Sequence, residues 1–107
     1  MISAGIGMVS IIIVKNKTNN LINKIDFVYD SDSKKTNLKK IKSNENKQTG
    51  ISTMSQVTNL RMSLNDGENS YLIKEILPRG YTDKLIITIN SFDNNNCEFV
   101  VDVEAYN

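Results

Sequence analysis

The amino-acid sequence predicts an all-β protein whose 107 residues form a single antiparallel β-sandwich of about seven or eight strands. Apolar side chains recur at every second position along most of the chain, and the spacing of an amphipathic helix is hard to find. Turn-forming residues separate these runs at intervals of roughly eight to twelve residues. The length is that of one ordinary domain. A hydrophobic content of 39% with 23% charged residues is typical of a folded globular protein.

The first part of the chain contains two predicted strands. Residues 8–15 include a long apolar run that is mostly β-branched, as expected of a strand that is covered on both faces or lies centrally in the sandwich. Residues 16–20 are rich in asparagine, which tolerates positive φ, and are predicted to turn. Residues 25–29 then place apolar and aromatic side chains at alternate positions, which predicts the second strand.

Residues 30–50 are the hardest part of the chain to assign. Residues 30–37 contain no apolar side chain and are predicted to be a solvated loop. In residues 38–50, Leu38 and Ile41 lie three positions apart, which allows either a single helical turn or an edge strand interrupted by a bulge. Lysine-rich strands are a common protection for an exposed sheet edge, so the sequence favours a short edge strand here.

The second half of the chain alternates between strands and clear turn signals. Asp66-Gly67 is the strongest hairpin signal, and Pro78 followed by Gly80 predicts another turn. The predicted strands of this half are residues 51–55, 59–64, 71–76, 84–90 and 97–106. The order of strands and turns is broadly like that of small immunoglobulin-like or jelly-roll modules with Greek-key connections, and no motif identifies one family.

The two ends of the chain bear on domain organisation and location. Residues 1–7 are predicted to be a flexible tip that precedes a single domain formed by residues 8–107. The apolar start has no positively charged region before it, as a signal peptide would have. It is also shorter than the roughly 20 residues of a membrane-spanning helix, so no transmembrane segment is predicted. A leader remnant or a membrane-touching arm is the alternative. The cytoplasm is slightly favoured over an exported or cell-surface location.

Catalysis is disfavoured by what the chain lacks. It has no histidine and one cysteine, which excludes histidine-dependent nucleophiles and zinc sites built from Cys and His. That cysteine, Cys97, is in phase with Phe99 and is predicted to be a small buried hydrophobic residue. Three carboxylates of the last strand are predicted to point into water, where they make poor general acids; they are Glu98, Asp102 and Glu104. The sequence therefore predicts a protein that is not an enzyme and needs no cofactor.

Loop carboxylates offer weak candidates for calcium binding. They are Asp30 and Asp32 in one loop, and Asp66 and Glu68 in another. The first loop does not match an EF-hand, because lysines occupy positions 34 and 35, where a ligand and a glycine are needed. Ordinary turns stabilised by short polar side chains explain the same residues, so no metal site is predicted.

Charge is unevenly distributed, although the formal net charge is only +1. Residues 1–50 carry nine lysines and four acidic residues, whereas residues 51–107 carry four basic and eight acidic residues. Strands from the two halves could neutralise each other across a sheet, or the lysines could form a basic face for a partner. Nucleic acid is disfavoured as that partner, because no aromatic residue for base stacking lies between Tyr29 and Tyr71.

These features predict a non-enzymatic binding or interaction module that acts through its loops or an exposed edge strand. Another protein is the favoured partner, and edge pairing could also produce a homo-oligomer. The alternative is a calcium- or carbohydrate-binding β-sandwich. Two loop aromatics either close the ends of the sandwich or mark a partner-binding tip. The candidate partner-binding residues are Lys34, Lys35, Lys39, Lys40, Lys42, Tyr81 and Phe92.

Overall fold

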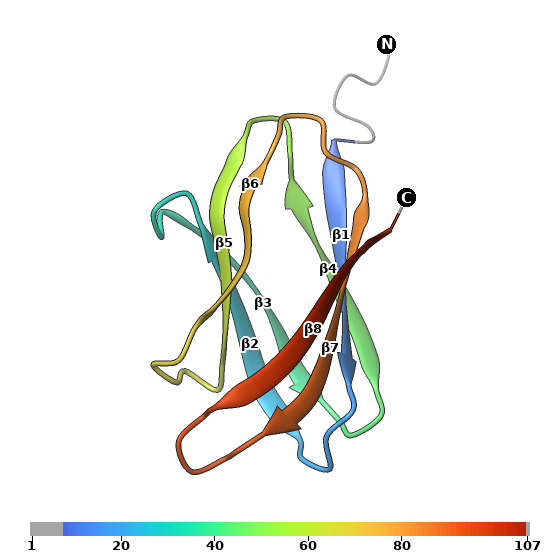
Figure 1. The fold of residues 1–107 in the computed structure, drawn as a ribbon, viewed down its shortest axis with the longest axis vertical. Helices are drawn as coiled ribbons and strands as arrows, with labels where there is room; N and C mark the ends of the chain where they lie inside the picture. Colours follow the sequence, from blue (N-terminus) through green and yellow to red (C-terminus); the bar gives the residue numbers. More distant parts are fainter. Residues whose placement is uncertain (1–7, 107) are drawn as a thin grey trace.

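The structure, a computed structural model, describes residues 8–106 and confirms a β-sandwich of eight strands in two four-stranded sheets (Figure 1). The strands are β1 (Val9–Asn16), β2 (Ile22–Tyr29), β3 (Lys34–Ile41), β4 (Asn46–Ser52), β5 (Val57–Leu64), β6 (Tyr71–Leu77), β7 (Lys84–Phe92) and β8 (Phe99–Tyr106). The described residues contain no helix, and therefore none long and apolar enough to cross a membrane. The flexible tip predicted for residues 1–7 lies outside the described part.

The strand order is β4-β1-β7-β8 in one sheet, here called sheet A, and β3-β2-β5-β6 in the other, sheet B. All neighbours are antiparallel except β1 and β7, which run parallel with Ile12 opposite Leu85. This pair departs from the purely antiparallel sandwich that was predicted. Alternation of side chains specifies which face a residue occupies and carries no information on the direction of a neighbour from the far end of the chain.

The core lies between the inner faces of the two sheets, as the period of two requires. The largest fully buried side chains include Phe27, Ile12, Ile25, Ile41, Leu60, Met62, Leu85 and Ile87. β1 is central in sheet A, as predicted, but only one of its faces is covered. Ile12 and Val14 are fully buried, whereas Ile11 and Ile13 are half-buried on the outer face.

The segment between β2 and β5 differs from its predicted assignment. β3 begins at Lys34, so residues 34–37 form a strand and the loop is limited to residues 30–33. These polar residues pair with β2, for example Thr36 with Phe27, and this backbone pairing outweighs their lack of apolar side chains. The proposed edge strand within residues 38–50 is in fact the end of β3 and the start of β4, which are edge strands of different sheets.

A local irregularity explains why Leu38 and Ile41 are three positions apart. Lys40, between them, adopts a positive φ of 54° in the left-handed region. Leu38 is half-buried and Ile41 fully buried, so both face the core on either side of this kink. The structure therefore supports the interrupted edge strand, and the helical turn does not form.

β5 and β6 form the predicted hairpin, but its turn lies one residue earlier than the Asp-Gly pair. Asn65 and Asp66 occupy the central positions with φ of 52° and 59°, and Gly67 N donates a hydrogen bond of 2.9 Å to Leu64 O. Two positive φ angles are the signature of a type I′ turn, which matches the twist of antiparallel strands. Gly67 has a different role, because a Cβ at this position would overlap the Cβ of Cys97.

Cys97 itself was predicted inside the last strand, and this placement is wrong. β8 begins at Phe99, and Cys97 lies in the preceding loop, half-buried against the core, with a positive φ of 57°. The left-handed conformation interrupts the alternation, so residues 97 and 99 belong to different local structures.

We expect Gly67→Ala to lower the free energy of unfolding by about 1–3 kcal/mol, because the added methyl overpacks the contact with Cys97. Cys97→Gly removes the two Cys97 atoms from this contact at a φ that suits glycine and leaves Leu64 O 3.1 Å from the added methyl, so in that background Gly67→Ala should cost less. Urea denaturation of both single variants and the double variant measures this coupling. Equal costs of Gly67→Ala in the two backgrounds would contradict it.

Candidate binding surfaces

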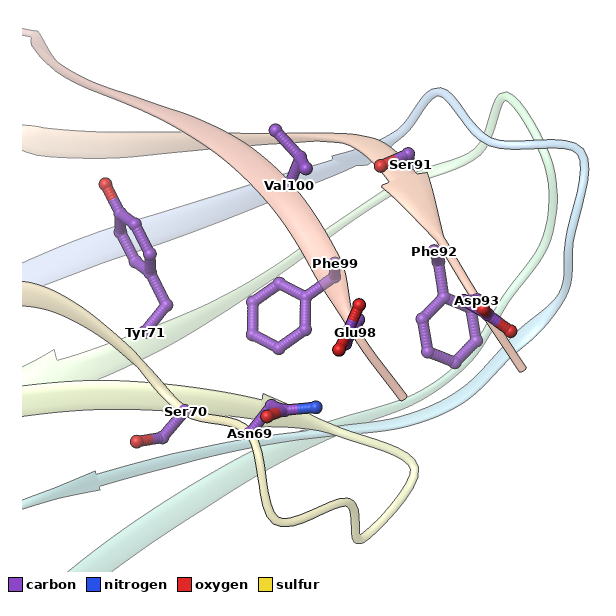
Figure 2. Close-up of a pocket in the computed structure, with 9 residues that line it drawn as sticks. All are labelled: Asn69, Ser70, Tyr71, Ser91, Phe92, Asp93, Glu98, Phe99 and Val100. Carbon is purple, nitrogen blue, oxygen red and sulfur yellow. The ribbon is translucent and has the colours of Figure 1, made fainter. Parts of the chain in front are cut away.

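The two long sides of the sandwich differ in how the sheets meet. On one side, β3 and β4 are joined by contacts between the sheets. Thr36 Oγ1 lies 3.3 Å from Thr49 Oγ1, and Lys47 Nζ donates a hydrogen bond of 2.8 Å to Lys39 O. On the other side, between the edge strands β6 and β8, the surface is hollowed by a groove of about 510 Å³ (Figure 2). Its lining residues are Asn69, Ser70, Tyr71, Ser91, Phe92, Asp93, Glu98, Phe99 and Val100. We call this the β6/β8 groove.

Aromatic side chains form the apolar part of the β6/β8 groove. Tyr71 is the first residue of β6 and is 39% exposed; Phe99 is the first residue of β8 and is half-buried. Figure 2 shows both rings in the space between the two edge strands. Neither residue was singled out from the sequence, since each fits an ordinary strand pattern, and only the sheet topology reveals that both strands are edges.

Phe92, a candidate for a partner-binding tip, lines the β6/β8 groove and is otherwise covered. It is the last residue of β7, pairs with Phe99, and is only 6% exposed, so it closes the end of the core. A bulge between Ile89 and Ser91 shifts the strand by one residue and turns Phe92 inward. The sequence left two interpretations open, and the structure favours the one in which Phe92 closes the end of the sandwich.

Polar groups around the β6/β8 groove are held in place by short loops. Asp93 N donates to Glu98 O at 2.9 Å and Asp93 Oδ1 accepts from Asn95 N at 2.9 Å, which shapes the turn between β7 and β8. Asn69 Nδ2 donates a hydrogen bond of 3.0 Å to Asn96 O, and this bond links the turn to the β5–β6 hairpin. Within residues 8–106, no cationic group lies within 4 Å of the Asp93 or Glu98 carboxylate. The groove therefore combines aromatic surface with unneutralised negative charge.

The five candidate lysines lie together on the opposite side of the molecule, along β3 and just after it. All are exposed, and we call this set the lysine edge: Lys34, Lys35, Lys39, Lys40 and Lys42. Lys34 pairs with Asp30 and Lys35 with Asp26, each at 3.6 Å. The other three form no ion pair with any described residue. Among the described residues, neutralisation between residues 1–50 and residues 51–107 is limited to one ion pair, Lys24 with Asp66 at 3.0 Å.

The Lys24–Asp66 pair stabilises the charged form of both groups. The hydrogen bond from the Lys24 ammonium lowers the pKa of the Asp66 carboxyl, and the same bond raises the pKa of Lys24. Lys24 also lies 3.5 Å from Asp26, a carboxylate that is buried on the outer face of sheet B beneath Lys24 and Lys35. These contacts attach the β5–β6 turn to β2.

Tyr81 does not join either surface. It lies in the loop between β6 and β7, at the end of β7 opposite Phe92, and packs partly buried against the core. Its carbonyl accepts a 2.7 Å hydrogen bond from Thr53 Oγ1. Burial raises the pKa of the Tyr81 hydroxyl, and the nearby Asp83 carboxylate raises it further. The structure thus separates Tyr81, Phe92 and the lysine edge into three places.

The calcium candidates are also far apart. Asp30 and Asp32 follow the end of β2, where Asp30 Oδ1 accepts from Thr58 N at 2.9 Å. Asp66 and Glu68 belong to the β5–β6 connection, near the beginning of β2. Within residues 8–106, no three His, Cys, Asp or Glu side chains gather closely enough to hold a metal ion.

The acidic residues of the last strand face water, as predicted. Asp102 and Glu104 are exposed on the outer face of β8, and Asp102 Oδ2 accepts a hydrogen bond of 2.9 Å from Asn90 Nδ2. Glu98 is exposed at the entrance of the β6/β8 groove.

Comparison with known proteins supports the fold. An NMR structure of a protein from Eubacterium rectale has a similar fold, with a TM-score of 0.56 and 15% sequence identity over 90% of this chain and 88% of that one. At this identity the similarity shows the fold alone. No family model matches the chain, and no curated protein matches it.

Proposed function

We propose that the protein is a non-enzymatic binding module that holds an extended segment of a partner protein along β8, above the β6/β8 groove. One observation carries the proposal: β8 is the last strand of sheet A, and half-exposed aromatic rings and unpaired carboxylates lie beside its start. An edge strand presents backbone N–H and C=O groups that an added strand can pair with.

The side chains around β8 define the kind of segment that fits. In an added strand, successive side chains point to opposite faces. Those on the inner face would contact Tyr71 and Phe99 in the groove, which favours apolar groups. Those on the outer face would lie beside Asp102 and Glu104, which favours lysine or arginine. The preferred segment is therefore one in which apolar and basic residues alternate.

A labelled peptide of alternating lysine and valine tests the proposal by fluorescence anisotropy, with a glutamate–valine peptide as the comparison. We expect the lysine peptide to bind and the glutamate peptide not to. We expect Tyr71→Ser combined with Phe99→Ser to weaken binding about tenfold or more, because removal of an aromatic anchor at an interface costs on the order of 1 kcal/mol or above.

The matched control is Leu21→Ser, which removes an exposed apolar side chain from the loop between β1 and β2. It should leave binding unchanged, and circular dichroism should show that all variants are folded. Amide chemical shifts perturbed by the peptide should cluster on β8 and on the start of β6. No binding, or binding that the aromatic substitutions do not affect, would refute the proposal.

Carbohydrate is the second candidate ligand for the same groove. The observation that favours it is that Asn69 and Asp93 line the same groove as the Tyr71 and Phe99 rings, since polar groups near an aromatic surface can bind a sugar ring from its edge and its face. A panel of soluble oligosaccharides, titrated against the same variants, separates the two. Loss of sugar binding in Tyr71→Ser, with no binding of the lysine peptide, would favour this candidate.

A further inference from the structure

Two edge strands of the sandwich, β3 and β8, carry complementary charges. β3 carries Lys34, Lys35, Lys39 and Lys40 and no acidic residue, whereas β8 carries Asp102 and Glu104 and no basic residue. Both strands are edges, β3 of sheet B and β8 of sheet A. Each of the two strands thus carries the charge opposite to that of the other.

We propose that a second copy of this chain is a partner of β8, with the lysine edge of one molecule docked on the β8 edge of the next. This inference rests on the proposed function, because it names the basic segment that β8 receives. Lys39 and Lys40 of the lysine edge have no carboxylate within 4 Å among the described residues, so their charges are available to Asp102 and Glu104 of the neighbour.

The apolar side chains of the two strands also suit the contact. The inner face of β3 carries Leu38, which is half-buried, and the inner face of β8 carries the half-buried Val103. An edge-to-edge contact would cover the remaining exposed surface of both, while Lys35 and Lys39 meet the carboxylates on the outer face. Cross-strand pairs of opposite charge and of apolar side chains both stabilise neighbouring strands.

The position of the two edges determines the form of the assembly. β3 lies beside β4 on one side of the sandwich, and β8 lies beside the β6/β8 groove on the other. A molecule that docks through its lysine edge therefore leaves its own β8 free for the next molecule. Such a head-to-tail contact is heterologous, and unless its rotation closes a ring it extends as a filament.

Lysines on an edge strand also protect a sheet from unwanted pairing, which predicts a monomer instead. Salt separates the two outcomes, because attraction between exposed charges extends about 30 Å at about 10 mM salt and about 3 Å at about 1 M. Sedimentation velocity of the intact chain should show association that grows with protein concentration at low salt and weakens at high salt. A protein that stays monomeric up to about 1 mM at low salt would overturn the inference.

Charge reversal identifies the surfaces. Lys39→Glu with Lys40→Glu removes the net positive charge of β3 and places two acidic side chains opposite Asp102 and Glu104 of the neighbour, and Asp102→Lys with Glu104→Lys makes both edges basic. Each double variant alone should associate at least about tenfold more weakly than the natural chain, because like charges then face each other. An equimolar mixture of the two should associate again, because each acidic edge then finds a basic one. The control, Lys17→Glu with Arg79→Glu, changes the charge equally away from both edges and should associate normally.

The mixture is the decisive sample. If each double variant still associates as the natural chain does, or if the mixture stays monomeric while both variants are folded, the head-to-tail contact is wrong. The lysine–valine peptide distinguishes this failure from that of the proposed function. A monomeric chain that binds the peptide on β8 loses only the self-association, whereas a monomeric chain that does not bind it loses both proposals.

Discussion

Phe27→Ala is expected to lower the free energy of unfolding by about 3–5 kcal/mol, which is a large share of the roughly 5–15 kcal/mol of a domain this size. Phe27 is completely buried on β2, between Thr36 of β3 and Met62 of β5, and is among the largest side chains in the core. Truncation removes its apolar surface from the core and leaves a cavity that the surrounding strands cannot fill without moving. Guanidinium denaturation followed by circular dichroism measures the loss.

Phe99→Ala is the matched control, since it removes the same group from the rim of the β6/β8 groove. Phe99 is half-buried, so its truncation exposes less new surface and leaves no enclosed cavity. We expect a cost of about 1–2 kcal/mol. A cost equal to that of Phe27→Ala would mean that Phe99 belongs to the core, and the groove would then be a packing defect with no open binding surface.

The core was predictable because it depends on a pattern that the sequence displays directly. Alternating apolar residues in residues 84–90 placed Leu85 and Ile87 inside, and the structure buries both completely. Where the pattern breaks, the prediction failed for a physical reason. Phe92 was assigned to a loop and Cys97 to the last strand, and both assignments are wrong, because a bulge at Ile89/Ser91 and a left-handed residue at 97 change the phase of the chain without a clear signal in the local composition.

The candidate sites were less predictable than the core. The residues of the lysine edge are close in sequence, so they were found together and lie together along β3 and just after it. The β6/β8 groove joins residues 69–71 to residues 91–100, and nothing local indicates that these segments meet. Their proximity depends on which strands end the two sheets, which is a property of the whole topology. A single sequence indicates well which face of a sheet a residue occupies, but it indicates poorly which strands lie next to each other.

Asn16 is a further residue whose importance only the structure reveals. The sequence predicts that it merely begins an asparagine-rich turn, yet its side chain is completely buried at the end of β1. Its Nδ2 donates to Asn20 O at 2.9 Å and to Ile41 O at 3.0 Å. Its Oδ1 accepts from Thr18 N at 3.0 Å and from Thr18 Oγ1 at 2.7 Å. One amide thus joins the end of sheet A to the end of β3 in sheet B.

We expect Asn16→Ala to lower the free energy of unfolding by about 2–4 kcal/mol. The substitution leaves the carbonyl of Ile41 and the N–H of Thr18 without this partner in a region that excludes water, and each unsatisfied buried group costs about 1–3 kcal/mol. Asn16→Asp keeps the acceptor for Thr18 and lacks the donor for Ile41, so we expect it to cost at least as much because it also buries a charge.

Asn19→Ala is the control, because Asn19 is exposed in the same turn and its side chain forms no hydrogen bond with any described residue. Its cost should stay within about 0.5 kcal/mol. Urea denaturation of the three variants separates the explanations. If Asn19→Ala lowers the free energy of unfolding as much as Asn16→Ala does, the stability of this turn comes from the preference of asparagine for the turn conformation. The buried hydrogen bonds of Asn16 would then contribute nothing beyond that preference. If Asn16→Asp is as stable as the natural chain, the bond to Ile41 contributes nothing, and the two sheets are held together at this end by apolar packing alone.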